Sequence, residues 1–357
     1  MAQNVSLNIP AHYNIYTGKS DRNLRIEFSI PNNGTNEDTG LVVLVPGFGA
    51  HIDSKVYAKM RDVFADQYNL ITIQCEYFGS SFMQGGQNLA FKNPDTVHQM
   101  LSIEELRIVV NDPSKLMQII SSKSITVEMV EKLNESIDEF NDMGFMQAID
   151  IITAVEATKI CLTENNLSFN KNRSIGYGHS HGAFLLHLCN RLSPAFSFII
   201  DNSAWLEPVY LHSNRVLSTR LDQANLLIEF NYIAKEILKQ KSSLNLRTIY
   251  KNFNNHAQIV SFQGDEDQLV NHVEKQAIIS SIHNAEFFLV TSEQIDHKKF
   301  KSNKHGLDAN FLELFSYALE LEKPIAYHNQ NSKFVADMDS VSIEADYTNG
   351  LPVFNFL

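Results

Sequence analysis

A five-residue segment near the middle of the chain, Gly178-His179-Ser180-His181-Gly182, has the composition of a reactive serine turn. It lies between an apolar stretch typical of a strand and the helical pattern of residues 183–189. A Gly-x-Ser-x-Gly turn from strand to helix holds its serine in a strained, exposed backbone conformation. The glycines are needed because a Cβ atom at either place would collide with the neighbouring strand and helix. Ser180 is therefore the predicted nucleophile. The alternative is an ordinary glycine-rich turn whose serine only caps the helix.

A nucleophilic serine needs a base that takes its proton and a carboxylate that orients the base. The predicted strand 257–262 is followed by Gly264-Asp265-Glu266-Asp267, and we predict Asp267 as the carboxylate. His305 directly precedes the last predicted helix and is the predicted base. Two alternatives stay open. Asp201, at the end of the strand after the serine, can replace the acid, and His297, in a lysine-rich loop, can replace the base.

Composition restricts the kinds of partner. The chain has 357 residues and a net charge of −12, with 44% hydrophobic and 20% charged residues, which is ordinary for a folded protein with a large core. The acidic balance argues against nucleic acid or an anionic membrane as the main partner. The three cysteines are widely spaced in apolar patterns, as in reduced cytoplasmic proteins. The first residues lack the basic and apolar parts of a secretion signal, and no apolar stretch reaches membrane-spanning length.

Strands and helices alternate along the chain, which predicts an α/β fold with a mostly parallel, doubly wound sheet. Gly85-Gly86 and Asn93-Pro94 predict loops where this alternation is interrupted. The predicted strands are 12–16, 24–29, 41–45, 70–75, 173–177, 196–200, 257–262 and 286–290, and the predicted helices are 54–68, 103–110, 127–140, 145–164 and 310–322. The expected organisation is N-terminal strands (1–40), an α/β core (41–78 and 143–322), a helical insertion (79–142), a helical cap (201–250) and a weakly periodic tail (323–357).

Four motifs occur along the chain with the serine first, the acid second and the histidine last of the three catalytic candidates. They are Pro46-Gly47-Phe48-Gly49, the serine pentapeptide, Gly264–Asp267, and His305-Gly306. Together they resemble the α/β-hydrolase superfamily over roughly residues 41–322. The resemblance implies that the backbone N–H groups of Phe48 and His181 hold an acyl oxyanion. More narrowly, the pentapeptide followed by Ile200-Asp201-Asn202-Ser203-Ala204-Trp205 resembles a bacterial hydrolase-like family of unknown function, DUF2920, which implies no substrate.

Three aromatic residues follow strand ends where a ligand crevice is expected, namely Tyr77, Phe78 and Trp205. We predict them as substrate-pocket residues, with core packing as the equal alternative. The histidines at 179, 181 and 187 suggest a metal site at first sight, but the turn geometry spreads them apart, and no metal is predicted. No phosphate-binding loop or dinucleotide fingerprint is present, and no cofactor is expected.

The sequence thus predicts a cytoplasmic serine hydrolase, carboxylesterase- or deacylase-like, that works through an acyl-enzyme. The expected substrate is a small-molecule acyl ester or an acylated sugar, with neither nucleic acid nor membrane as partner. Two alternatives remain. One is an acyltransferase that passes the acyl group to a sugar or another alcohol, and the other is a hydrolase-like binding protein without catalysis. The sequence does not predict an oligomeric state.

Overall fold

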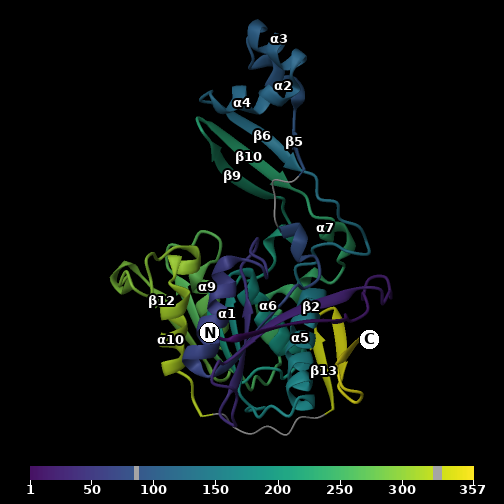
Figure 1. Cartoon of the computed structure of the whole chain (residues 1–357), viewed down its shortest axis with the longest axis vertical. Coiled ribbons are helices and arrows are strands. Elements are labelled where there is room, and N and C mark those ends of the chain that lie inside the picture. The colour runs from purple at the N-terminus through teal and green to yellow at the C-terminus, as the bar shows by residue number, and fades with distance from the viewer. Residues whose placement is uncertain (84–87, 325–331) are drawn as a thin grey trace.

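The computed structural model describes residues 1–83, 88–324 and 332–357 (Figure 1). Its centre is an eight-stranded sheet in the order β1-β2-β4-β3-β7-β8-β11-β12. β1 and β2 pair antiparallel, as do β2 and β4, and all further pairs are parallel. The predicted mostly parallel α/β sheet is confirmed. The strands are β1 (Gln3–Pro10), β2 (Asn23–Ile30), β3 (Gly40–Val45), β4 (Leu70–Cys75), β7 (Ser174–His179), β8 (Phe198–Asn202), β11 (Gln258–Gly264) and β12 (Ala285–Val290).

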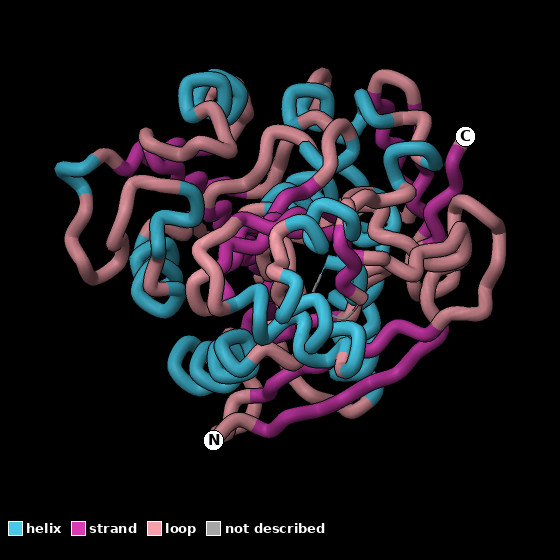
Figure 2. Tube along the Cα trace, turned by 90° about the horizontal axis from the view of Figure 1, so that it is seen from above, coloured by secondary structure: helices cyan, strands magenta, loops and turns pink. Residues whose placement is uncertain are grey.

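Helices cover both faces of this sheet, so its central strands are continuous apolar runs (Figure 2). Every residue of β3 and of β4 is buried. One face packs against α1 and α10, where the rings of Phe64 and Phe315 stack with centroids 4.0 Å apart. The other face packs against α5 and α6, whose residues belong to the larger core. The bounds of these helices are α1 (Lys55–Tyr68), α5 (Phe145–Glu164), α6 (His181–Leu192) and α10 (Phe311–Glu320).

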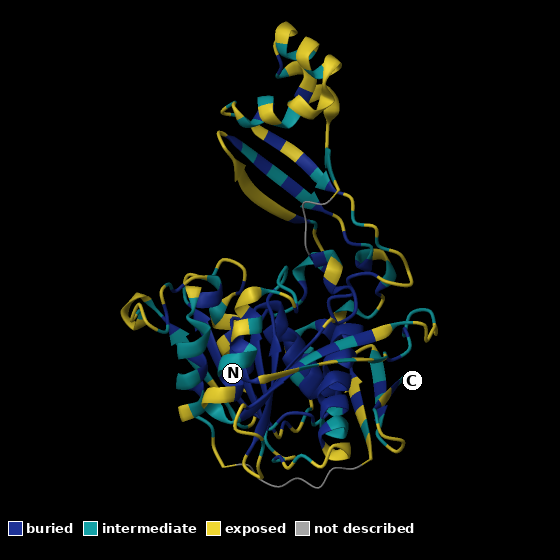
Figure 3. Cartoon of the chain, viewed as in Figure 1, coloured by how far each residue is buried: buried dark blue, intermediate teal, exposed yellow. Residues whose placement is uncertain are grey.

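A second sheet stands away from the central one, beside three helices (Figure 1). Its order is β5-β6-β10-β9, and β6 and β10 come from segments far apart in the chain and pair in parallel. We call this part the outer lobe. α3 buries none of its residues, and most residues of α2 and α3 are exposed (Figure 3). The elements are β5 (Leu89–Phe91), α2 (Pro94–Gln99), α3 (Ile103–Asn111), α4 (Leu116–Ser121), β6 (Thr126–Glu131), β9 (Arg215–Leu221) and β10 (Ala224–Phe230).

Two predictions for this part of the chain are wrong. The predicted helix 127–140 begins as strand β6 and continues without helix, and the segment 201–250, expected to be helical, contains the hairpin β9–β10. The physical reason is the period of burial. Alternate residues of β10 are buried, which suits a strand with one covered face and not a helix. Asn93 and Pro94, predicted as a loop, begin α2, while Gly85 and Gly86 lie outside the described residues.

The two ends of the chain also differ from expectation. Residues 12–16 form a turn at Asn14 and not a strand, whereas β1 lies at Gln3–Pro10. The tail is ordered into an antiparallel sheet of β13 (Lys333–Met338), β14 (Val341–Asp346) and β15 (Val353–Phe356). The backbone N–H of Phe354 donates to His12 Nε2 over 2.8 Å, so this sheet packs on the N-terminal segment.

The remaining α-helices of the described residues are α7 (Ala234–Ile237), α8 (Leu246–Tyr250) and α9 (His272–Ile279), and short 3-10 helices occur in several loops, one of them at His305–Asp308. Among residues 1–83, 88–324 and 332–357, none of the helices has the length and apolarity required to cross a bilayer. Cys75, Cys161 and Cys189 are all free thiols.

Candidate active site

Ser180 occupies a sharp turn between β7, which ends at His179, and α6, which begins at His181. Its backbone angles, φ 55° and ψ −120°, are outside the regions that L-residues favour. A Cβ on Gly178 would lie 2.4 Å from the Cα of Ala183, and one on Gly182 would lie 2.2 Å from the carbonyl oxygen of Val45. Glycine is therefore required at both positions, as the motif predicts. The strain holds the serine hydroxyl at the carboxyl edge of the sheet.

The structure brings the three predicted side chains into one hydrogen-bonded row. Ser180 Oγ lies 2.7 Å from His305 Nε2, and His305 Nδ1 lies 2.7 Å from Asp267 Oδ2. The carboxylate accepts from Nδ1–H, which leaves the lone pair on Nε2 free to accept the serine proton. Each residue comes from a different segment at the same edge of the sheet: the turn after β7, the loop after β11 and the segment after β12. This arrangement can activate a serine for attack on a carbonyl carbon.

Asp267 is held in one orientation by several donors. Its Oδ2 also accepts from Gln263 Nε2 over 2.7 Å, and its Oδ1 accepts from the N–H groups of Leu269 (2.8 Å) and Val270 (3.0 Å). Burial of the side chain would by itself raise the pKa of Asp267, but the hydrogen bonds and the charge of His305 outweigh it and lower the pKa below its usual value. The carboxyl group therefore stays ionised beside the imidazole.

Asn202 and Ser203, at the end of β8, support the loop that carries His305. The N–H of Gly306 donates to Ser203 Oγ over 3.1 Å, and Asn202 Nδ2 donates to the carbonyl oxygen of Gly306 over 3.4 Å. Gly306 has φ 75°, and a Cβ there would lie 2.5 Å from His179 Nε2. The Gly that follows His305 in the sequence was the available signal for this close approach.

The alternative residues are not part of this row. His297 is exposed, and its backbone N–H bonds to Phe300. Asp201 is a fully buried residue of β8, and its carboxylate contacts Lys275 Nζ at 2.9 Å and His187 Nε2 at 3.0 Å. Burial would raise the pKa of Asp201, but the charge of Lys275 and the hydrogen bond from His187 lower it. Asp201 is therefore one partner of a buried ion pair. No pattern in the sequence indicated that Lys275 is the other partner.

The two backbone groups implied as oxyanion donors lie in adjacent segments. Gly182 packs directly on Val45 and Pro46, which places the start of α6 beside the loop that contains Phe48. His181 is the first residue of α6, so its N–H has no acceptor within the helix. No described residue accepts a hydrogen bond from the N–H of Phe48 or of His181. Both groups remain available to a developing negative charge.

The two histidines that flank Ser180 are neutral. Burial lowers the pKa of His179 to about 4, with a contribution from the charge of His305, and lowers the pKa of His181 to about 3. His181 Nε2 lies 3.4 Å from the carbonyl oxygen of Met143, to which it donates. Within the described residues, no group of three or more His, Cys, Asp or Glu side chains is arranged to hold a metal ion.

The predicted pocket residues separate into two environments. Trp205 stacks on Phe48 with ring centroids 5.5 Å apart, so it borders the loop that carries a predicted oxyanion donor. Tyr77 lines a small cavity of about 140 Å³ beside that loop. Phe78 is buried against Phe140, and it lines none of the described cavities. Phe78 and Trp205 are both buried, and of the two Trp205 contacts the ring of Phe48, so a pocket role stays a prediction for all three residues.

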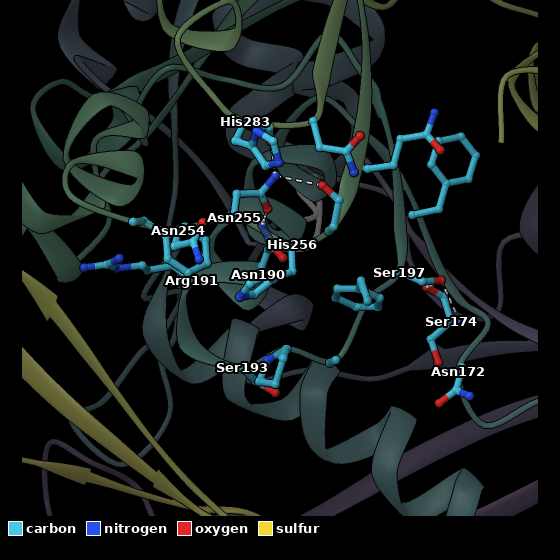
Figure 4. A pocket seen from close by; sticks show the side chains of 18 of the residues that line it. Asn172, Ser174, Asn190, Arg191, Ser193, Ser197, Asn254, Asn255, His256 and His283 are labelled. Atoms are coloured by element: carbon cyan, nitrogen blue, oxygen red, sulfur yellow. Dashed lines mark hydrogen bonds between the residues drawn. The ribbon is translucent and has the colours of Figure 1, made fainter. Parts of the chain in front are cut away.

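A cavity of about 590 Å³ lies at the other edge of the central sheet (Figure 4). Its lining includes Ser174, Phe198 and Gln258, which are the first residues of β7, β8 and β11, while the candidate site lies where these strands end. Asn190, Ser193 and Asn255 also line it, as the close view shows. This cavity contributes no residue to the Ser180 row.

Comparison with solved structures shows a shared fold at low identity. Acylaminoacyl peptidase from Pyrococcus horikoshii matches with a TM-score of 0.50 and 12% identity, covering 93% of this chain and 43% of the peptidase. Est1E from Butyrivibrio proteoclasticus, with ferulic acid bound, matches with a TM-score of 0.46 and 12% identity over 87% of this chain and 98% of that one. Dienelactone hydrolase from Anabaena variabilis gives a TM-score of 0.41 and 10% identity over 90% and 95%.

At this identity, the likeness to the peptidase shows the fold alone, which is the α/β-hydrolase fold. No curated protein matches the sequence. A protein family described as being of unknown function, DUF2920, matches residues 18–257, a range that contains Ser180 and Asp201. Because this match spans well over half of the chain, the protein belongs to the DUF2920 family.

Proposed function

We propose that the protein is a serine hydrolase that cleaves an ester or a related acyl bond through an acyl-enzyme. The observation that carries the proposal is the row Ser180–His305–Asp267, with two contacts of 2.7 Å, on a strained turn that requires glycine on both sides. A carbonyl compound is the substrate class that this chemistry serves. A small-molecule acyl ester or acylated sugar is the proposed substrate, and no metal or cofactor is needed for these steps.

In the first half-reaction, Ser180 Oγ attacks the carbonyl carbon while its proton passes to His305 Nε2. Asp267 holds the imidazole in the required tautomer and stabilises the imidazolium. The N–H groups of Phe48 and His181 stabilise the oxyanion of the tetrahedral intermediate. His305 then returns the proton to the departing alcohol oxygen as the ester C–O bond breaks, which leaves the acyl group on Ser180.

In the second half-reaction, a water molecule takes the place of the alcohol. His305 Nε2 accepts a proton from the water as its oxygen attacks the acyl carbon, and the bond from that carbon to Ser180 Oγ breaks. The imidazole gives the proton back to the serine oxygen. The products are a carboxylic acid and the free enzyme, so each turnover consumes one water.

A second candidate is transfer of the acyl group to a sugar or another alcohol. It is favoured by the low exposure of Ser180, 5%, because a site that excludes water protects an acyl-enzyme from hydrolysis. Product analysis with and without alcohol acceptors separates transfer from hydrolysis.

The three free thiols support a reducing compartment, and we place the protein in the cytoplasm as part of the proposal. Neither a nucleic acid nor a membrane is proposed as a partner, given the net charge of −12.

The decisive experiment is labelling of the folded protein with a fluorophosphonate probe, together with turnover of short acyl esters. Ser180→Ala should abolish labelling and lower turnover by about 10⁶-fold, because the members of such a row act as a unit. Ser213→Ala, an exposed serine, is the matched control and should behave as the wild type. Wild-type protein that is folded but neither labels nor hydrolyses any ester would instead support a binding protein without catalysis.

A further inference from the structure

Arg215, the first residue of β9, is a buried cation beside the candidate site. It is 9% exposed, and its guanidinium carbon lies 4.9 Å from the ring centres of both Phe48 and Phe230. Its Nη1 donates to the carbonyl oxygen of Met83 over 2.8 Å. Arg215 therefore joins the outer lobe to the loop that carries a proposed oxyanion donor.

No carboxylate of the chain neutralises this guanidinium. Neither of the undescribed segments, 84–87 and 325–331, contains Asp or Glu, and no acidic side chain in the described residues forms an ion pair with Arg215. Glu135, a half-buried carboxylate of this region, accepts instead from the backbone N–H groups of Asn141 and Ile233. Contacts with two aromatic faces offset only part of the cost of burying a cation.

Two further buried donors lie on rings that contact Phe48. The Tyr232 hydroxyl oxygen accepts from the Arg215 guanidinium, and no described residue accepts a hydrogen bond from the Tyr232 hydroxyl or from the indole Nε1 of Trp205. Both rings contact Phe48, with centroids 5.5 and 5.8 Å from its centre. Burial raises the pKa of Tyr232 to about 12, so its hydroxyl keeps its proton and can donate. Buried donors without an acceptor are rare in folded proteins, and an ordered water or a bound ligand is what satisfies them.

We infer that Arg215, with Trp205 and Tyr232, forms an anion subsite, so that the acyl ester used by Ser180 carries a carboxylate. A carboxylate is the anion that fits, because one planar guanidinium matches its two oxygens and its single charge. A phosphate monoester carries nearly two charges and would call for a further cation. The neighbouring cations do not supply it, since Lys92 pairs with Glu229 and the charge of Lys235 acts on the same carboxylate.

The ring of Phe48 separates the subsite from the serine turn. The ring of Phe48 lies between Arg215 and His181, with centroids of Phe48 and His181 5.3 Å apart, and His181 follows Ser180 in the chain. A carboxylate here would sit several bonds from the scissile carbonyl, as in the half-esters of short dicarboxylic acids. Because the subsite serves the reacting serine, this inference rests on the proposed function.

The test compares matched esters that differ only in charge. The 4-nitrophenyl half-esters of succinate, glutarate and adipate are compared with the corresponding diesters, in which the free carboxyl is methylated, with the uncatalysed rate subtracted for each. A second pair, 4-acetoxybenzoate and its methyl ester, places the charge on the alcohol side. Wild-type protein should show a kcat/KM at least about tenfold higher for the charged member of one series, as expected for a charge-assisted hydrogen bond. Equal values in both series would overturn the inference.

Variants then assign the preference to Arg215. Arg215→Gln should lower kcat/KM for the charged ester about 10- to 100-fold and leave the methylated ester within about threefold. Arg215→Lys should restore part of the preference, because it keeps the charge but not the planar fork. Arg220→Gln is the matched control, an exposed arginine on the same strand. If folded Arg215→Gln loses both esters equally, Arg215 only supports the loop and the inference fails.

A binding measurement separates this inference from the proposed function. Monomethyl adipate is titrated into wild type, Ser180→Ala and Arg215→Gln by calorimetry. Binding by the first two proteins but not by Arg215→Gln supports the anion subsite even if no ester is turned over. Ester hydrolysis with probe labelling but without any charge dependence would instead keep the proposed function and reject the subsite.

Discussion

His305 Nε2 lies 2.7 Å from Ser180 Oγ although 125 residues separate the two in the chain. The contact exists because β7, β8, β11 and β12 are neighbouring parallel strands whose carboxyl ends meet at one edge of the sheet. The turn after β7 brings the serine to this edge, and the segment after β12 brings the imidazole. The loop after β11 adds Asp267 on the far side of the ring.

Replacement of the imidazole should separate the two candidate histidines. His305→Ala should lower kcat for a short acyl ester by several orders of magnitude, on the order of 10⁶-fold for a member of a cooperative row. His297→Ala should leave kcat within about twofold, since an exposed side chain away from the site contributes little. Steady-state kinetics on the two purified variants checks this. If only His297→Ala lost activity, His297 would be the base, and the assignment to His305 would be wrong.

Asp267→Asn should affect both rate and pH dependence. The amide cannot hold the same imidazole tautomer, so kcat should fall by about 10⁴-fold while the fold is kept. The pKa of Asp267 is lowered in the folded protein. Its ionised form therefore stabilises the fold at pH values above the pKa of an aspartate in the unfolded chain, about 3.9. This stabilisation is lost as the pH falls through the folded-state pKa.

Urea unfolding of wild type and Asp267→Asn between pH 7 and pH 3 measures that contribution. The difference in free energy of unfolding should be largest near neutral pH and shrink below about pH 4. A difference that grows on acidification would contradict the lowered pKa.

Asp201→Ala should act on stability and not on chemistry. It leaves Lys275 as an unpaired buried cation, so the free energy of unfolding should fall by about 3–5 kcal/mol. The double variant Asp201→Ala/Lys275→Met should regain part of this loss, because it removes the stranded charge. Chemical denaturation of both variants gives the comparison. The fraction that stays folded should still label with a fluorophosphonate. A stable Asp201→Ala protein that does not label would instead point to a catalytic role for Asp201.

Gly182→Ala should disrupt the serine turn. A Cβ at this position would lie 2.2 Å from the carbonyl oxygen of Val45 and 2.4 Å from that of Pro46, and backbone atoms cannot yield as a flexible side chain does. We expect a loss of about 3 kcal/mol or more in stability, the upper end for overpacking, together with loss of probe labelling. Thermal unfolding and labelling test this. A variant with unchanged melting temperature and labelling would show that α6 can move away from β3.

The site was accessible to sequence reasoning because its residues sit in local patterns. The glycines at 178, 182 and 306 mark places where a Cβ atom has no room, and such restrictions are visible in the sequence itself. The strand β3 could be recognised since both of its faces are covered, which produces an uninterrupted apolar run. By contrast, residues 215–230 were predicted as helical although β10 alternates between buried and half-buried positions.

Local sequence determined the serine turn, its flanking strand and helix, and the order in which acid and base follow. Only the tertiary structure decided which of two aspartates and which of two histidines reach the serine, because the successive parallel pairs of β7, β8, β11 and β12 bring residues 125 positions apart to one edge of the sheet. It also decided that Lys275 belongs with Asp201 and that Arg215 lies against Phe48 without a carboxylate. A buried charge depends on the partners that folding brings to it, and no pattern within one segment records them.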